Sequence, residues 1–193
     1  MSITTVSEGA PKAGEASQSL FYALDRQDRI IDVGGAWDDF ALENDGKSVL
    51  RERVLGTPVF KHVNGDISAM YLRTLLSSVR LLDRSVTRCY RCDSPGTKRF
   101  MEMTLTPDAD DGVMIAHRLL RTESLPARFI FTVAKGRPSF AVRCSMCNRL
   151  KQDGEWQEPE VLLSKHDWGN AQPRSVIYGV CDDCMTGIRS ADE

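Results

Sequence analysis

The pattern of apolar and polar positions predicts an α+β portion followed by a shorter C-terminal portion. In "LFYALDRQDRIIDVGG", which starts at Leu20, two short apolar runs surround a polar turn, and this predicts a β-hairpin. The apolar residues of "AWDDFALEN" then fall at helical spacing. Further along, the β-favouring runs "SVTRCYRC", "RFMEMTLTP" and "GVMIAHRLL" are separated by turn formers and predict a meander of three antiparallel strands.

The segment from Asp66 to Leu82 is the strongest predicted helix. Its apolar residues recur every three or four positions, and they are Ile67, Met70, Tyr71, Leu75, Val79 and Leu82. We expect one buried stripe there, formed by Ile67, Met70, Leu75 and Val79. Two strands, short helices, one long helix and three strands together predict a five-stranded antiparallel sheet with helices on one face.

Several of these stretches resemble a known family. "AWDDFALEN", "VLGTPVFKHVNGD" and "YRCDSPGTKRFMEMTLTP" resemble parts of small bacterial PAS-like proteins, and the order of elements resembles that of a PAS domain. The resemblance covers about Leu20 to Arg121, the size of a common domain. It implies a sensory or protein-interaction module in signal transduction, which often dimerises and can hold a small organic ligand. The sequence does not identify that ligand, the stimulus or the partner.

Two Cys-x-x-Cys pairs carry the most specific chemistry in the chain. Cys144 and Cys147 are separated by 33 residues from Cys181 and Cys184. Zinc prefers four soft ligands in a tetrahedron, and each pair supplies two thiolates from one tight turn. We therefore expect these four residues to bind one zinc ion per chain in a closed, structural site. Iron fits the same ligands, so the choice of metal stays open.

The C-terminal segment also resembles a Cys-x-x-Cys, Gly-x-Trp, Cys-x-x-Cys module, a zinc-ribbon-like tail found after PAS or receiver domains in bacterial signalling proteins. Gly154 and Trp156 supply the middle of that pattern. The gap between the cysteine pairs exceeds the roughly 15 to 20 residues of compact zinc fingers. We expect the intervening piece, with Trp156, Leu162 and Leu163, to pack over the site.

Thiol redox chemistry is the alternative use of the same cysteines, either in a sensor or in an oxidoreductase. A thioredoxin-like role requires a Cys-x-x-Cys at a helix start after a βαβ unit, and neither pair has that predicted context. Cys89 and Cys92 form a third pair, but residues three apart on a strand point to opposite faces. We expect one of these two thiols in the core and the other near the surface.

The remaining candidates are weaker. Of the three histidines, His62 is expected in a turn, His117 on the core side of the sheet, and His166 near the metal only as a replacement ligand. Core positions such as Trp37, Phe40, Met101, Met103 and Ile115 fit a packed interior as well as a ligand cavity. We find no P-loop, dinucleotide fingerprint or nucleophile elbow, which favours a non-catalytic protein.

Composition and charge complete the expectation. Residues 144–193 carry 5 Lys and Arg against 9 Asp and Glu, a net charge of 5 − 9 = −4, which disfavours binding to nucleic acid. No apolar run approaches the roughly 18 residues of a membrane span, and the first residues lack the features of a secretory signal, so we expect a cytoplasmic protein. The expected organisation is a mobile tail (1–18), a PAS-like domain (19–121), a connecting segment (122–143) and a zinc-binding module (144–193).

Overall fold

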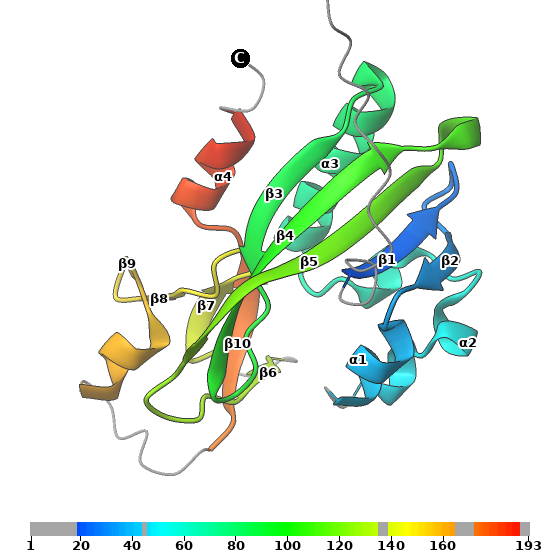
Figure 1. Cartoon of the computed structure of the whole chain (residues 1–193). Coiled ribbons are helices and arrows are strands. Elements are labelled where there is room, and N and C mark those ends of the chain that lie inside the picture. The colour runs from blue at the N-terminus through cyan, green and yellow to red at the C-terminus, as the bar shows by residue number, and fades with distance from the viewer. Residues whose placement is uncertain (1–18, 44–45, 135–138, 165–171, 190–193) are drawn as a thin grey trace, which may run out of the picture.

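The computed structural model describes residues 19–43, 46–134, 139–164 and 172–189 (Figure 1). The predicted N-terminal tail, 1–18, lies outside the described residues. The described part of the chain forms two five-stranded sheets. The first sheet and its helices comprise β1 (Ser19–Leu24), β2 (Ile30–Gly34), α1 (Trp37–Glu43), α2 (Arg51–Val54), α3 (Asp66–Leu82), β3 (Val86–Arg91), β4 (Thr97–Pro107) and β5 (Val113–Ser124). The second sheet and its helix comprise β6 (Phe131–Val133), β7 (Ala141–Cys144), β8 (Leu150–Gln152), β9 (Glu155–Gln157), β10 (Arg174–Gly179) and α4 (Asp182–Arg189). Short 3-10 helices lie at η1 (Lys47–Val49), η2 (Val59–His62), η3 (Ala109–Asp111) and η4 (Pro159–Ser164).

The first sheet is antiparallel throughout and has the strand order β2-β1-β5-β4-β3. The predicted five-stranded antiparallel sheet and the α+β class are therefore confirmed. Its core-facing side chains alternate with more exposed ones, as in Val113, Met114 and Ile115 of β5, because successive side chains of a strand point to opposite faces.

Helix α3 packs its apolar face against this sheet. Leu75, Leu76 and Val79 are at most 1% exposed and share one core with residues of β4 and β5. The predicted bounds of the helix are confirmed, but its predicted buried face is partly wrong. Ile67 and Met70 are 42% and 48% exposed, because the buried face instead passes through Ser68, Tyr71 and Leu72.

The buried face starts at Ser68 because a segment distant in sequence covers the first turn of α3. The Ser68 hydroxyl hydrogen-bonds the hydroxyl of Ser145, which follows β7 of the second sheet. A polar residue therefore occupies a buried position that an apolar pattern cannot mark. The second sheet determines which side of α3 is covered at this end.

The second sheet has the order β6-β10-β7-β8-β9. Strand β10 is parallel to both of its neighbours, whereas β7, β8 and β9 are antiparallel in succession. A small core beneath it contains Phe129, Ala141, Leu150, Leu162 and Val176. The expected connecting segment, 122–143, contributes β6 and most of β7 to this sheet, and β5 extends three residues beyond position 121.

The two sheets adjoin where β3 ends. The backbone N–H of Arg91 donates to Met146 O at 2.6 Å, and Asn148 Nδ2 donates to Arg91 O at 3.1 Å. The β3–β4 turn adds two backbone bonds, in which Leu125 and Phe129 donate to the carbonyls of Gly96 and Pro95. These bonds join the first sheet to the segment that leads into the second.

Buried ion pairs reinforce this junction. The Arg91 guanidinium, whose side chain is 6% exposed, pairs with Asp93 and with Glu158, the latter at 2.6 Å. The Lys98 ammonium pairs with Glu158 at 3.1 Å and also with Glu160. Although burial alone would raise the pKa of Glu158, hydrogen bonds from Arg91 and Lys98 hold that pKa below its usual value. The carboxylate is therefore the stable form in the junction.

Candidate metal centre

Two adjacent strands bring the cysteine pairs together. Cys144 ends β7, and Cys181 follows β10 by two residues. Because β7 and β10 are parallel, both strands end at the same edge of the sheet, where Cys144 is in register with Gly179. The 33 residues between the pairs leave this edge and return to it, so cysteines that are distant in the sequence lie close together in the structure.

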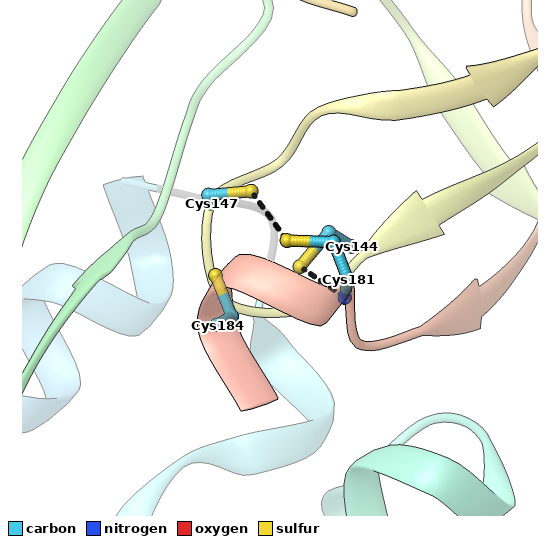
Figure 2. Close-up of side chains that lie close together, drawn as sticks. All are labelled: Cys144, Cys147, Cys181 and Cys184. Atoms are coloured by element: carbon cyan, nitrogen blue, oxygen red, sulfur yellow. Dashed lines mark hydrogen bonds between the residues drawn. The ribbon is translucent and has the colours of Figure 1, made fainter. Parts of the chain in front are cut away.

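The four sulfur atoms form a compact cluster (Figure 2). All lie within 4.8 Å of one another, and Cys147 Sγ is 3.7 Å from Cys181 Sγ. All four cysteines are free thiols rather than disulfide partners. A tetrahedral site with metal–sulfur bonds of about 2.3 Å has sulfur–sulfur edges of about 3.8 Å. The cluster is therefore of the right size to hold one metal ion after small side-chain adjustments.

A tight turn presents the first pair. After Cys147, Asn148 adopts a left-handed backbone conformation with φ of 61°. Its N–H donates to Cys144 O at 3.0 Å, and Cys144 N–H donates to Arg149 O at 2.9 Å. Asparagine tolerates this conformation better than most residues. The turn folds back on itself and directs both thiols toward the same side.

The start of α4 presents the second pair. Cys181 immediately precedes the helix and Cys184 lies in its first turn, as Figure 2 shows. The partial positive charge at a helix N-terminus favours thiolate over thiol. In addition, Cys181 N–H donates to Cys144 Sγ at 3.4 Å. Local backbone groups thus favour negative charge on this cluster.

The four thiols share that charge unequally, because hydrogen bonds with the Cys144 thiol raise the pKa of Cys147 to about 11 and also raise the pKa of Cys184. Hydrogen bonds from the thiols of Cys147 and Cys184 lower the pKa of the Cys144 thiol well below its usual value, against the opposing effect of burial. Arg149 is the nearby cation. Desolvation opposes its charge, but attraction to Cys147 raises the pKa of Arg149 overall. Arg149 Nη1 also pairs with Asp183 of α4 at 3.0 Å.

The cluster is partly buried, since Cys147 and Cys184 are only partly covered. Cys144 and Cys181 are 0% and 1% exposed, and they belong to the same apolar core as α3. Trp156 of β9 is partly buried and packs against this core. Leu162 does not, because it lies in the separate core of the second sheet. The Leu163 side chain lies outside the described residues.

The third cysteine pair does not join the cluster. Cys89 is exposed on β3, whereas Cys92, just beyond the strand, is partly buried. Burial raises the pKa of the Cys92 thiol. Cys89 therefore matches the expected surface thiol, whereas Cys92 is only partly buried rather than in the core.

The histidines are also placed apart from the thiols. His117 lies on the core side of β5, where its ring stacks on Tyr22 and its Nδ1 is 2.9 Å from the Tyr90 hydroxyl. Burial lowers the pKa of His117 to about 4. His62 ends the 3-10 helix η2 rather than lying in a turn, and it is exposed and hydrogen-bonds Thr57 at 2.9 Å. His166 lies outside the described residues.

Other residues proposed from the sequence have packing roles. Met101, Met103 and Ile115 are buried, and Trp37 Nε1 donates to Val49 O at 2.7 Å. Sequence reasoning missed Arg91, Asn148 and Arg149. Asn148 had a readable signal, because asparagine directly after a Cys-x-x-Cys turn suits a left-handed residue, whereas the role of Arg91 depends on contacts distant in sequence.

No protein-family model matches this chain, and no curated protein sequence matches it. In the part of the chain that the structure describes, no helix is both long enough and apolar enough to cross a membrane.

Proposed function

We propose that Cys144, Cys147, Cys181 and Cys184 bind one zinc ion in a closed structural site. The observation that carries this proposal is the cluster of four free thiols within 4.8 Å of one another at one sheet edge. Zinc takes four thiolates in a tetrahedron, and such a site leaves no coordination position for water or substrate. The ion therefore holds structure together and does not catalyse a reaction.

The site stabilises the junction between the two sheets. Its first turn carries Met146 and Asn148, which are both hydrogen-bonded to the backbone of Arg91. A metal that fixes this turn also fixes the end of β3. Metal binding therefore contributes free energy both to the second sheet and to its attachment to the first.

We further propose that the chain is a PAS-like, non-catalytic signalling module of the cytoplasm. The resemblance in sequence motivates this role. The observed order of two strands, short helices, the long helix α3 and three strands agrees with what that resemblance implies. The proposed partner is a signalling protein or a second copy of the chain, rather than nucleic acid or membrane, since the segment 144–193 has a net charge of −4.

Exposed apolar side chains on the first sheet support association with a protein. Ile31 of β2 is 55% exposed and Met114 of β5 is 41% exposed. Light scattering over a range of concentrations tests for a dimer, and pull-down from a lysate tests for a partner. Met114→Glu is expected to weaken association, whereas Leu81→Glu, at an 84% exposed position on α3, is the matched control. A strict monomer without partner contradicts this part of the proposal.

Metal analysis tests the zinc site directly. Protein purified without chelators is expected to contain one zinc per chain by elemental analysis and by native mass spectrometry. Cys181→Ser should lose the metal, and Cys89→Ser, which changes an exposed thiol outside the cluster, should retain it. Absence of stoichiometric metal, or equal loss in both variants, contradicts the proposal, and stoichiometric iron would change the identity of the metal.

A redox sensor is the second candidate, because the Sγ atoms of Cys147 and Cys181 are already 3.7 Å apart. A two-electron oxidant such as a peroxide would convert two thiols into a disulfide, with release of the metal. Mass spectrometry after mild peroxide treatment distinguishes the two roles. A reversible disulfide between Cys147 and Cys181 at low peroxide, detected as a loss of two hydrogen atoms, favours the sensor. Resistance of the metal-bound protein to this oxidation favours the structural site.

A further inference from the structure

An arginine that follows the first cysteine turn reaches the helix that carries the second pair. Arg149 lies two positions after Cys147, and its Nη1 donates to a carboxylate oxygen of Asp183 in α4 at 3.0 Å. Asp183 directly precedes Cys184 in the chain. The Arg149 guanidinium also donates a hydrogen bond to the sulfur of Cys147. One side chain thus contacts a thiol of the first pair and the neighbour of a thiol of the second.

The charge of a four-thiolate site explains what a cation does there. Four thiolates around one divalent ion leave two negative charges in excess. Where water is partly excluded, such charge is costly unless hydrogen-bond donors or a cation offset it. At the buried cysteines, the backbone N–H of Cys181 donates to Cys144 Sγ at 3.4 Å. At the partly covered Cys147, Arg149 supplies a full positive charge from a side chain that is 31% exposed.

The ion pair between Arg149 and Asp183 contributes little stability by itself. The Asp183 side chain is 72% exposed, and exposed ion pairs add little to the free energy of folding. The carboxylate helps to orient the guanidinium, but it also places a negative charge next to Cys184. Loss of Asp183 therefore removes orientation and relieves repulsion at the same time, whereas loss of Arg149 removes the compensating cation. The two partners should differ in their effect on metal binding.

We propose that Arg149 is a positioning residue of the metal site, whose charge stabilises the four-thiolate form and so raises the affinity for a divalent metal ion. This inference rests on the proposed zinc site. Arg149 does not ligate the ion, because a guanidinium offers no acceptor, and it acts through Cys147. The guanidinium keeps its positive charge throughout the ordinary pH range. Residues that support metal ligands in this way change metal affinity about 10- to 100-fold.

Competition with a chromophoric chelator measures the zinc affinity of the full-length protein. Arg149→Gln keeps hydrogen-bond donors but removes the charge, and it should weaken zinc binding by about 10-fold or more. Arg149→Lys keeps the charge and should restore most of the lost affinity. Asp183→Asn should weaken binding less than Arg149→Gln does. Arg128→Gln, at an exposed position in the segment that leads to the second sheet, is the matched control and should bind zinc like the parent.

The cobalt(II) form adds a spectroscopic signature that a merely structural contact would not move. The sulfur-to-cobalt charge-transfer absorption depends on the energy of the sulfur electrons, which a neighbouring cation lowers. Arg149→Gln should therefore shift this absorption to longer wavelength. Arg149→Lys and Arg128→Gln should leave it close to that of the parent.

The outcomes separate this inference from the proposed zinc site. The role of Arg149 is overturned if the parent binds zinc stoichiometrically and Arg149→Gln binds it equally tightly with an unshifted cobalt absorption. It is also overturned if Asp183→Asn weakens binding as much as Arg149→Gln, since the contact would then act as an ordinary ion pair. In both cases the zinc site itself stands. A parent protein that binds no stoichiometric metal would overturn the zinc site and this inference together.

Discussion

The two sheets reach stability by different means. The first sheet covers a continuous apolar core in which Leu75, Val79, Leu105 and Ile115 are at most 1% exposed. The second sheet has a smaller core, and four thiols lie close together at one of its edges. As thiolates, these groups need a metal ion or protons to neutralise their negative charge. A core of ordinary size stabilises a domain by burial, whereas a small one usually needs a metal or another cross-link. The comparison predicts that the stability of the second sheet depends on metal binding by its thiols, whereas the stability of the first sheet depends on its buried apolar residues.

The two sheets share part of one apolar core, so metal loss at the second sheet should also affect the first. The cysteines belong to the same apolar core as α3, and Arg91 joins the end of β3 to the turn that carries Cys147. From the sequence alone, chelation is expected to unfold the tail and spare the first domain. The shared core instead predicts that metal loss also destabilises the end of β3.

Metal removal is expected to have the largest effect. Structural zinc sites contribute on the order of 10 kcal/mol or more to the folding of the segments that bind them. We expect chelation, or Cys144→Ser, to remove hydrogen-exchange protection from β7 and β10 and to reduce it at the end of β3. The strands β1 and β5 should keep their protection. Loss confined to the second sheet, with β3 unaffected, would show that the two regions are energetically separate.

Breaking the buried ion pairs should have the next largest effect. Arg91→Met leaves Asp93 and Glu158 without their main cation, and removal of one partner from a buried pair costs about 3–5 kcal/mol. Urea unfolding of the metal-containing protein measures this loss. Arg118→Met is the control, since its pair with Glu102 is on the surface and its arginine side chain is 65% exposed. Equal stability of the two variants would mean that the junction contributes little.

Truncation inside the first core comes third. Leu75 is 1% exposed, so Leu75→Ala should lower the free energy of unfolding by about 2–5 kcal/mol. Met70 lies on the same helix but is 48% exposed, and Met70→Ala should cost well under that amount. The metal content of both variants should equal that of the parent. Similar losses of stability from the two truncations would indicate that Met70 is covered in solution, for instance by a partner.

Acid should destabilise the first region through a smaller, localised effect at His117. Burial lowers the pKa of His117 from 6.5 to about 4, so the unfolded chain binds a proton more readily than the folded one. This contribution is complete above pH 6.5 and is lost as the pH falls toward 4. The difference between the two pKa values corresponds to about 3 kcal/mol of folding stability. His117→Gln, compared with the parent by unfolding between pH 7 and pH 4.5, should reduce the slope of stability against pH, and an unchanged slope contradicts the assignment.

Several features of this protein are determined by local sequence. The helix over Asp66–Leu82 and the strands that flank it follow from the spacing of apolar residues and from turn formers such as Pro95 and Gly96. The pairs Cys144/Cys147 and Cys181/Cys184 are likewise readable, because a Cys-x-x-Cys turn brings its two thiols to one side. The exposure of Cys89 is likewise consistent with its place in the alternating pattern of β3.

Other features are decided only by the tertiary structure. The two cysteine pairs meet because β7 and β10 pair in parallel, a contact between segments that no local pattern links. The buried face of α3 turns away from Ile67 and Met70 because Ser145, distant in the chain, covers Ser68. Arg91 reads as an ordinary surface charge in the sequence, and it acquires its role from contacts with Glu158 and Asn148. Local sequence sets the conformation of each segment, but burial and charge pairing depend on which distant segments come into contact.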